Sequence, residues 1–267
     1  MKKFAILLGT TVLSSVIAVG AASAVEAGRF YIKGEANYNF ATTKITTDVS
    51  QTAAAEGSKA TKVIDNKEFT QNGKGVGFSG GLGCNVADQI RAEAAFHYTN
   101  LSLKPDGSSS SSSELKSEEK PKVTSWGILA NAYYDLNNTG GFIPYVMAGV
   151  GYGKTNFKLP STSDNFFVNY FGLTATEIKA LSDAGIKITD IIKPTSTNNF
   201  LWNVGVGAAI ELQKGIYIDI GYRFGNVGKV KFDNIKATGS AKEVYTGTVS
   251  MKNANRHAIS AGLRIAF

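Results

Sequence analysis

Ten charged side chains stand at alternate positions in segments that are otherwise apolar or small. Five of them are acidic and five are basic, so their charges balance. A charge removed from water is tolerated only when it is paired, and alternate residues of an extended segment share one face. We therefore predict a network of paired charges inside the fold, whose members are Lys33, Glu35, Arg91, Glu93, Asp135, Glu211, Asp219, Arg223, Arg256 and Arg264.

Residues that could support catalysis or bind a metal are scarce. The chain has two histidines, His97 and His257, and one cysteine, Cys84, which are too few for a zinc site. The glycine-rich run at residues 73–77 lacks the spacing and the following helix of a phosphate-binding loop. No local motif positions serine, histidine and acid together, although a site split between strands would leave no motif. We expect no enzymatic activity, no cofactor and no metal site.

The carboxy-terminal segment, residues 254–267, indicates which kind of element positions the charges. Its side chains alternate with a period of two, which is typical of a β-strand with one apolar and one wet face. The wet face is small and charged, as in the lumen of a membrane barrel and unlike the core of a soluble sandwich. The apolar face holds His257, Ile259, Ala261, Leu263, Ile265 and Phe267, and the wet face holds Arg256, Ala258, Ser260, Gly262, Arg264 and Ala266.

The same alternation recurs in seven earlier segments, and the connections between the segments are alternately long and short. This pattern predicts an all-β fold, an eight-stranded antiparallel up-and-down transmembrane β-barrel with long extracellular loops. We expect strands over residues 28–40, 75–86, 89–101, 123–136, 142–157, 199–212, 216–227 and 254–267, and long polar loops over 41–74, 102–122, 158–198 and 228–253. The third of these loops contains a capping box at 174–177, which predicts a short helix over 175–184.

The amino terminus is typical of a secretion signal. Lys2 and Lys3 precede a mostly apolar stretch, and the Ala-Ser-Ala at 22–24 matches a cleavage site, so we predict a signal peptide over 1–24 and an outer-membrane barrel domain over 25–267. Beyond it, no apolar run reaches the roughly 18 residues of a spanning helix, so entry into a membrane requires a barrel or a peripheral attachment. The lysines of this basic chain, with a formal charge of +7, crowd the loops and form no stripe, which argues against nucleic-acid binding.

Aromatic side chains on the apolar faces fall into two groups about ten residues apart. Membrane–water interfaces select two belts of this kind. The belt expected at the short-turn end is Phe30, Tyr134, Phe142 and Phe267, and the belt expected at the long-loop end is Tyr38, Tyr98, Trp126, Tyr152, Trp202 and Tyr222.

Three motifs carry a resemblance to known barrels: Pro-Tyr-Val-Met-Ala-Gly-Val-Gly-Tyr at 144–152, Tyr-Arg-Phe at 222–224, and the terminal Ile-Ala-Phe. With them the chain resembles the eight-stranded OmpA-type and opacity-type barrel families of Gram-negative outer membranes. Its long Lys/Ser/Thr-rich loops are similar in style to those of surface antigens and adhesins of rickettsia-like intracellular bacteria. The resemblance implies a bacterial outer-membrane location and a role for Phe267 as the signal read by the barrel-insertion machinery.

Three functions are compatible with this interpretation. The first is an adhesin or surface antigen whose extracellular loops bind host surface proteins, serum proteins or envelope components, because loops on a rigid scaffold commonly carry binding. The alternatives are a small porin, against which the crowded lumen argues, and a structural envelope protein. The other expected partners are outer-membrane lipid and lipopolysaccharide, and we expect a monomer that binds no nucleic acid.

Overall fold

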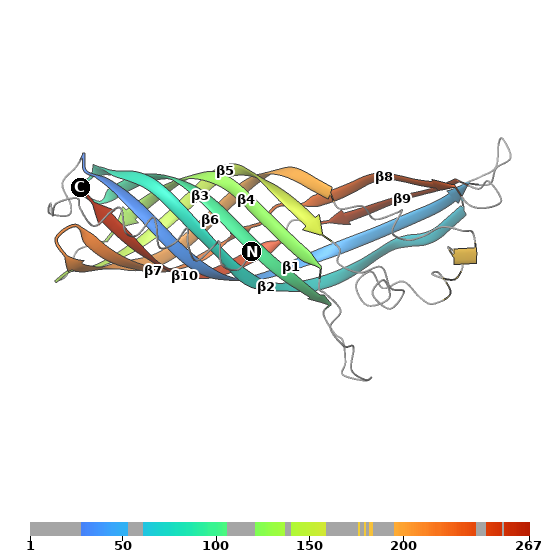
Figure 1. Cartoon of the computed structure of the whole chain (residues 1–267), viewed down its shortest axis with the longest axis horizontal. Coiled ribbons are helices and arrows are strands. Elements are labelled where there is room, and N and C mark those ends of the chain that lie inside the picture. Colours follow the sequence, from blue (N-terminus) through green and yellow to red (C-terminus); the bar gives the residue numbers. More distant parts are fainter. Residues whose placement is uncertain are drawn as a thin grey trace, which may run out of the picture.

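Eight antiparallel strands close into a barrel. The computed structural model describes residues 28–52, 61–105, 121–136, 140–158, 195–238, 244–252 and 254–267, and four single residues between 176 and 183. The ring runs in chain order from the first strand to the seventh, then to β10, which pairs back with the first (Figure 1). Its members are β1 (Phe30–Thr52), β2 (Thr61–Ala87), β3 (Ile90–Pro105), β4 (Lys122–Asp135), β5 (Phe142–Lys158), β6 (Thr195–Gln213), β7 (Ile216–Asn226) and β10 (Asn255–Ala266).

The tight turns gather at one end of the barrel. Ala87 and Ile90 face each other across the β2–β3 turn, and Gln213 and Ile216 do so across the β6–β7 turn. Gly215 in the latter turn has a φ of 82°, a left-handed conformation that glycine adopts without steric cost. At the same end, the Phe267 N–H donates to the Phe30 carbonyl at 2.9 Å. The start of β1 and the end of β10 therefore meet on the short-turn side.

All eight predicted strands are confirmed, but the prediction that residues 41–74 form a loop is wrong for 41–52 and 61–74, which are strand. β1 and β2 continue as a paired hairpin far past the barrel, with partners running from Thr42 and Asn72 to Gln51 and Thr61. Beyond the apolar band of the barrel, polar residues such as Thr42 and Lys44 occupy the outward face of the hairpin while Thr43 and Ile45 stay buried, so the apolar outward face that marks the ring strands is missing from its sequence. The Thr-rich composition still suits strands.

The last predicted loop, residues 228–253, also contains strands. β8 (Val230–Thr238) pairs with β9 (Val244–Met251), and β9 pairs with β1 from Ile45 opposite Met251 to Thr52 opposite Val244. The outer parts of β2 and β1 thus form a four-stranded sheet with β9 and β8, which we call the extension. Figure 1 shows these strands projecting together past the long-loop end of the ring.

Two further predictions fall largely outside the described residues. The signal peptide over 1–24 lies wholly outside them. Within the predicted helix over 175–184, only Thr176, Lys179, Ser182 and Asp183 are described, and each has helical backbone. The helix as a whole stays a prediction.

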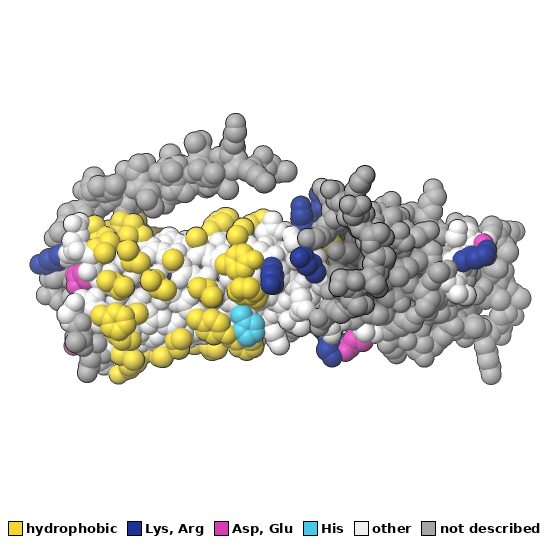
Figure 2. Space-filling model, turned by 90° about the horizontal axis from the view of Figure 1, so that it is seen from below, with side chains coloured by type: hydrophobic (Ala, Val, Ile, Leu, Met, Phe, Trp, Pro, Cys, Tyr) yellow, Lys and Arg dark blue, Asp and Glu magenta, His cyan; other side chains and the backbone are white. Residues whose placement is uncertain are grey.

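Inward and outward residues alternate along every strand of the ring. In β4, for example, Tyr133 is buried while Tyr134 is 45% exposed. Figure 2 shows the exposed hydrophobic side chains gathered over the barrel half of the molecule, with Lys and Arg side chains beyond them. An apolar exterior around a polar interior is the reverse of a soluble protein and is typical of a barrel in lipid. No helix within the described ranges is long and apolar enough to cross a membrane.

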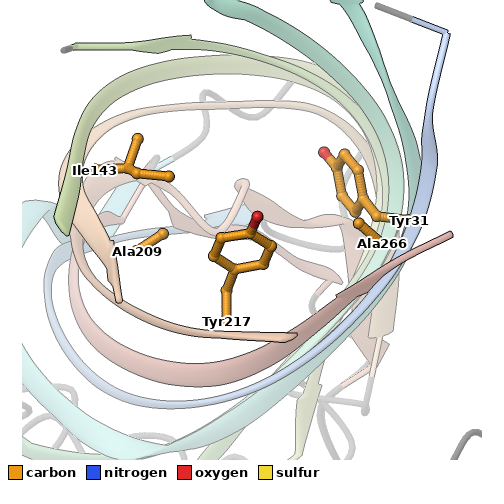
Figure 3. Close-up of a cluster of buried hydrophobic side chains, with 5 residues drawn as sticks. All are labelled: Tyr31, Ile143, Ala209, Tyr217 and Ala266. Carbon is orange, nitrogen blue, oxygen red and sulfur yellow. The ribbon is translucent and has the colours of Figure 1, made fainter. Parts of the chain in front are cut away.

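Apolar side chains close the lumen at the short-turn end. Tyr31, Ile143, Ala209, Tyr217 and Ala266 form a buried cluster, and Figure 3 shows them pointing into the ring from different strands. A second buried cluster contains Tyr133, Tyr145 and Met147. These large rings leave little free cross-section, as expected for an eight-stranded barrel.

The buried tyrosine rings leave no room for a side chain on the strand beside them, so glycine stands there. A first prediction follows from this close packing. A Cβ built on Gly207 would lie 2.5 Å from the Tyr145 hydroxyl oxygen and 2.5 Å from the Ile220 carbonyl oxygen. We expect Gly207→Ala to lower the free energy of unfolding in lipid vesicles by about 1–3 kcal/mol through overpacking. Gly34→Ala is the matched control, because a Cβ there meets nothing within 4 Å. Equal urea midpoints for the two variants would contradict the tight lumen.

Candidate functional site

Five of the predicted charges form one network in the middle of the lumen. Glu35 accepts from Arg223 at 2.6 Å and lies 3.0 Å from the Lys33 ammonium. Asp219 accepts from the Arg264 Nε at 3.1 Å and lies 3.9 Å from Lys33. Strands β1, β7 and β10 supply these residues, and Lys33 joins the two carboxylates. The network therefore ties the first strand to the last two, across the closure of the ring.

The side chains of this network are almost wholly removed from solvent, with exposed fractions of 1–6%. Burial of charge is costly, and removing one partner of a buried pair leaves the other uncompensated. Aromatic rings give the cations further support: Lys33 Nζ lies 5.4 Å from the Tyr133 ring, and the Arg264 guanidinium lies 4.1 Å from the Tyr217 ring. This arrangement can rigidify the lumen.

A second ion pair lies nearer the short turns. The Arg91 guanidinium donates to both carboxylate oxygens of Asp135, from Nε and Nη2, each at 2.7 Å. The same guanidinium lies 4.4 Å from the Tyr133 ring and 5.3 Å from the Tyr145 ring. A bidentate pair fixes both position and orientation, so β3 and β4 are locked together at this level.

Seven of the ten predicted residues form ion pairs: the five of the central network and the Arg91–Asp135 pair. The other three form none among the described residues, and they are Glu93, Glu211 and Arg256. Glu93 instead accepts from Tyr133 at 2.9 Å and Asn131 at 3.0 Å. Glu211 accepts from Tyr217 at 3.3 Å. Arg256 donates from Nη1 to the Thr99 hydroxyl at 3.0 Å.

The role of tyrosine as a partner of these charges was missed by the sequence analysis. Tyr31, Tyr133 and Tyr217 each stand two residues before a charged residue of the set, and so on the same face of the strand. That spacing is the signal that could have identified them. Tyrosine hydroxyls satisfy carboxylates that lack a cation, which is why the ten charges need not all pair with one another.

The two histidines occupy different positions. His97 is buried in the outer half of the lumen, and His257 lies on the outside, with its Nδ1 2.6 Å from the Tyr222 hydroxyl. Within the described ranges, no three His, Cys, Asp or Glu residues are grouped so that they could hold a metal ion.

The root of the extension is pinned to the barrel by side-chain hydrogen bonds. Asn199 of β6 donates to the Lys229 carbonyl at 3.0 Å and accepts from the Lys229 N–H at 2.9 Å. Thr155 of β5 donates to the Val227 carbonyl at 2.6 Å and accepts from Asn199 at 3.2 Å. The segment leading into β8 is thus held against β5 and β6, so the extension has a defined direction relative to the ring.

An exposed acid joins three parts of the extension. Glu68 of β2 accepts from Lys44 of β1 at 2.6 Å and also from Lys252, just after β9. The Thr43 hydroxyl donates to the Lys252 carbonyl at 2.9 Å. Together these contacts hold the end of β9 against the hairpin.

This acid gives a second prediction. Hydrogen bonds from Lys252 and then Lys44 lower the pKa of Glu68 from 4.5 to about 2. A carboxyl whose pKa is lowered stabilises the fold fully above its ordinary pKa and loses that contribution as the pH falls through the lowered value. We expect faster amide hydrogen exchange in β9, relative to barrel strands, as the pH falls from 5 toward 2, after correction for intrinsic rates. The Glu68→Gln variant should lack this acceleration. If the exchange rates of β9 depend on pH in the same way in both proteins, Glu68 does not hold β9 in place.

Two aromatic belts mark the edges of the apolar exterior. At the short-turn end, Phe30, Tyr134, Phe142 and Phe267 are each about half exposed. Toward the long-loop end, Tyr38, Trp126, Tyr152 and Tyr222 point outward. A closed ring of strands satisfies every backbone group internally, and the apolar band between the belts faces hydrocarbon. The fold and its lumen therefore define an integral membrane β-barrel.

Comparison with known proteins gives the family. Residues 9–242 match the model of the outer membrane protein beta-barrel domain, and the chain belongs to this family. It is an outer-membrane protein, with the extension beyond the membrane. Outer membrane protein PagN of Salmonella typhimurium is 32% identical over 47% of this chain and 44% of its own, so the match spans less than half of that relative.

Two further similarities cover more of the chain. A protein of Rickettsia bellii, named as a candidate adhesin, is 24% identical over 76% of this chain and 81% of its own. The crystal structure of Neisserial surface protein A is 15% identical with a TM-score of 0.43, covering 93% of this chain and all of that one.

Proposed function

We propose that this protein is a surface adhesin that binds host or envelope proteins through the extension. The observation that carries the proposal is a four-stranded sheet that continues from the barrel strands β1 and β2 and is completed by β9 and β8. A scaffold anchored in the membrane and locked by a buried charge network holds this sheet at a fixed direction. Pre-ordered binding elements lose less entropy on association than flexible loops do.

Two further facts support the proposal. Among the relatives, the Rickettsia bellii protein named as a candidate adhesin matches over three quarters of this chain. Lys229 and Lys231, at the base of the extension, are exposed and form no ion pair among the described residues, and the exposed Lys44 and Lys252 share one carboxylate, that of Glu68. A surface of this kind steers acidic partners toward it.

The test removes the extension in parts. Val227 N–H donates to the Ala254 carbonyl at 3.1 Å, so residues 229–252 can be replaced by a short glycine-containing turn that joins β7 to β10. In a second variant, residues 43–71 are replaced by a turn between Thr42 and Asn72, which face each other across the β1–β2 pair. Each variant is displayed on a non-adherent Gram-negative strain, and bacteria bound to cultured host cells are counted.

We expect both deletions to reduce binding to the level of the strain without the protein. The matched control replaces the Lys214–Gly215 turn, which lies at the opposite end of the barrel. Heat-modifiable gel mobility verifies that each barrel is folded. If either folded deletion variant binds host cells as well as the intact protein does, the proposal that the whole extension forms the binding surface is wrong. Stepwise conductance of the intact protein in planar bilayers would favour a porin instead.

A further inference from the structure

A small cavity with a mixed polar and apolar lining lies in the outer half of the lumen, above the charge network. Its polar lining is His97 and Thr99 of β3, Ser125 of β4, Asn226 of β7 and Arg256 of β10, and its other half is apolar or glycine. The cavity measures about 10 Å³, which gives room for about one particle the size of a water molecule.

Arg256 differs from the other four cations of the lumen set. Lys33, Arg91, Arg223 and Arg264 each have a carboxylate oxygen within 4 Å. Arg256 is only 7% exposed, yet no ion pair in the described part of the chain includes it. Its Nη1 bonds to a neutral hydroxyl, and its Nε has no hydrogen-bond partner there.

Other buried polar groups at this level also lack partners within the described residues. His97 is 6% exposed and its Nε2 has no hydrogen bond. Asn203 is 1% exposed, and neither its Oδ1 nor its Nδ2 is bonded. Asn203 and Arg256 both face Gly225 in the strand register, from β6 and β10 respectively. A cation and several polar groups therefore converge at one level of the lumen, and no carboxylate oxygen of the described residues lies within 4 Å of the Arg256 guanidinium.

A buried cation without a paired carboxylate is strongly unfavourable, and the N–H and O–H donors beside it in the cavity are complementary to negative charge. Because the cavity has room for about one water-sized particle, a monatomic anion displaces the lining side chains less than phosphate, sulfate or a carboxylate-bearing ligand would. We propose that the outer half of the lumen binds one monatomic halide, chloride under physiological conditions. The Arg256 guanidinium supplies the charge, and the Thr99 and Ser125 hydroxyls with the His97 ring supply further donors.

The test measures unfolding of the full-length protein, refolded in zwitterionic vesicles, in urea. Sodium chloride is exchanged for sodium gluconate at constant ionic strength, so that general screening is unchanged. A ligand that binds only the folded state raises stability in a saturable way. We expect the urea midpoint to rise with chloride and then level off, and to rise in the same way with bromide.

The variant Arg256→Gln removes the charge at the site, and we expect it to lose this halide-dependent shift. Arg264→Gln is the matched control: Arg264 is equally buried but bound to Asp219, so its loss should lower the midpoint while the halide response persists. A wild-type midpoint that is the same in chloride and gluconate would overturn the proposal. A full halide response in Arg256→Gln would do the same.

A direct measurement covers the case in which Arg256→Gln does not fold. Crystals of the unaltered protein grown in sodium bromide are examined at the bromine absorption edge. We expect one anomalous peak inside the barrel, between the Arg256 guanidinium and the Thr99 hydroxyl. No anomalous density in the lumen would refute the halide site.

Discussion

Replacing Glu35 by alanine is expected to produce the largest loss of stability of any single charge removal in the lumen. Glu35 is bound by both Arg223 and Lys33, and its side chain is 1% exposed. Its removal leaves Arg223 without its carboxylate partner and Lys33 with only Asp219, at 3.9 Å. Breaking a buried pair in this way costs about 3–5 kcal/mol. Urea unfolding in lipid vesicles, followed by tryptophan fluorescence, measures the change.

Two variants sharpen this prediction. Glu68→Ala also removes a glutamate bound by two lysines, but on the exposed extension, and we expect little change in the same assay because exposed pairs contribute little. Glu35→Leu combined with Arg223→Leu should regain part of the lost stability, since an apolar pair of similar volume can replace a buried ion pair. Similar losses for Glu35→Ala and Glu68→Ala would contradict the buried network.

Placing arginine on the outer face of the barrel should also be strongly destabilising. Val146 lies near the middle of the stretch of β5 between the belt residues Phe142 and Tyr152 and is 44% exposed, which in an outer-membrane barrel means exposed to lipid tails. A charged side chain at the bilayer midplane costs about 2–4 kcal/mol, and the cost falls to about 0–1 kcal/mol near the interface. We therefore expect Val146→Arg to lower the free energy of unfolding by the larger amount.

Asn156→Arg on the same strand provides the depth control. Asn156 points to the same side as Val146 but stands ten residues nearer the long-loop end, two beyond Lys154. We expect only a small change in its unfolding free energy. If the two substitutions cost the same, the apolar band around Val146 does not face hydrocarbon, and the assignment of the faces is wrong.

The ring strands and their faces could be predicted because alternation is a local property. In β10, Ile259 faces outward while Arg256 and Arg264 are buried, and each is placed by its own position in a period of two. The medium on each side selects the residue type, so the pattern appears without knowledge of any partner strand. The outward aromatic belts follow from the same rule.

The pairing inside the lumen could not be predicted, because it depends on how the strands are staggered around the ring. Arg223 and Glu35 are separated by 188 residues and meet only when β10 closes the barrel between β7 and β1. The balance of five acids and five bases suggested complete pairing. Glu93 instead accepts hydrogen bonds from a hydroxyl and an amide, and Arg256 forms no ion pair within the described ranges. Composition gives the sum of the charges and no distances between them.

The segments that cross the membrane, the face of each that meets lipid, and the presence of charge inside can all be predicted from the amino-acid sequence, since each follows from the contrast between hydrocarbon and a polar lumen. The outward continuation of β1 and β2 and their pairing with β9 and β8 become visible in the folded chain alone. Beyond the membrane no hydrocarbon selects apolar residues for the outer face, so strand formation there depends on long-range backbone pairing. The same closure of the ring placed Arg256 in a cavity without a carboxylate among the described residues.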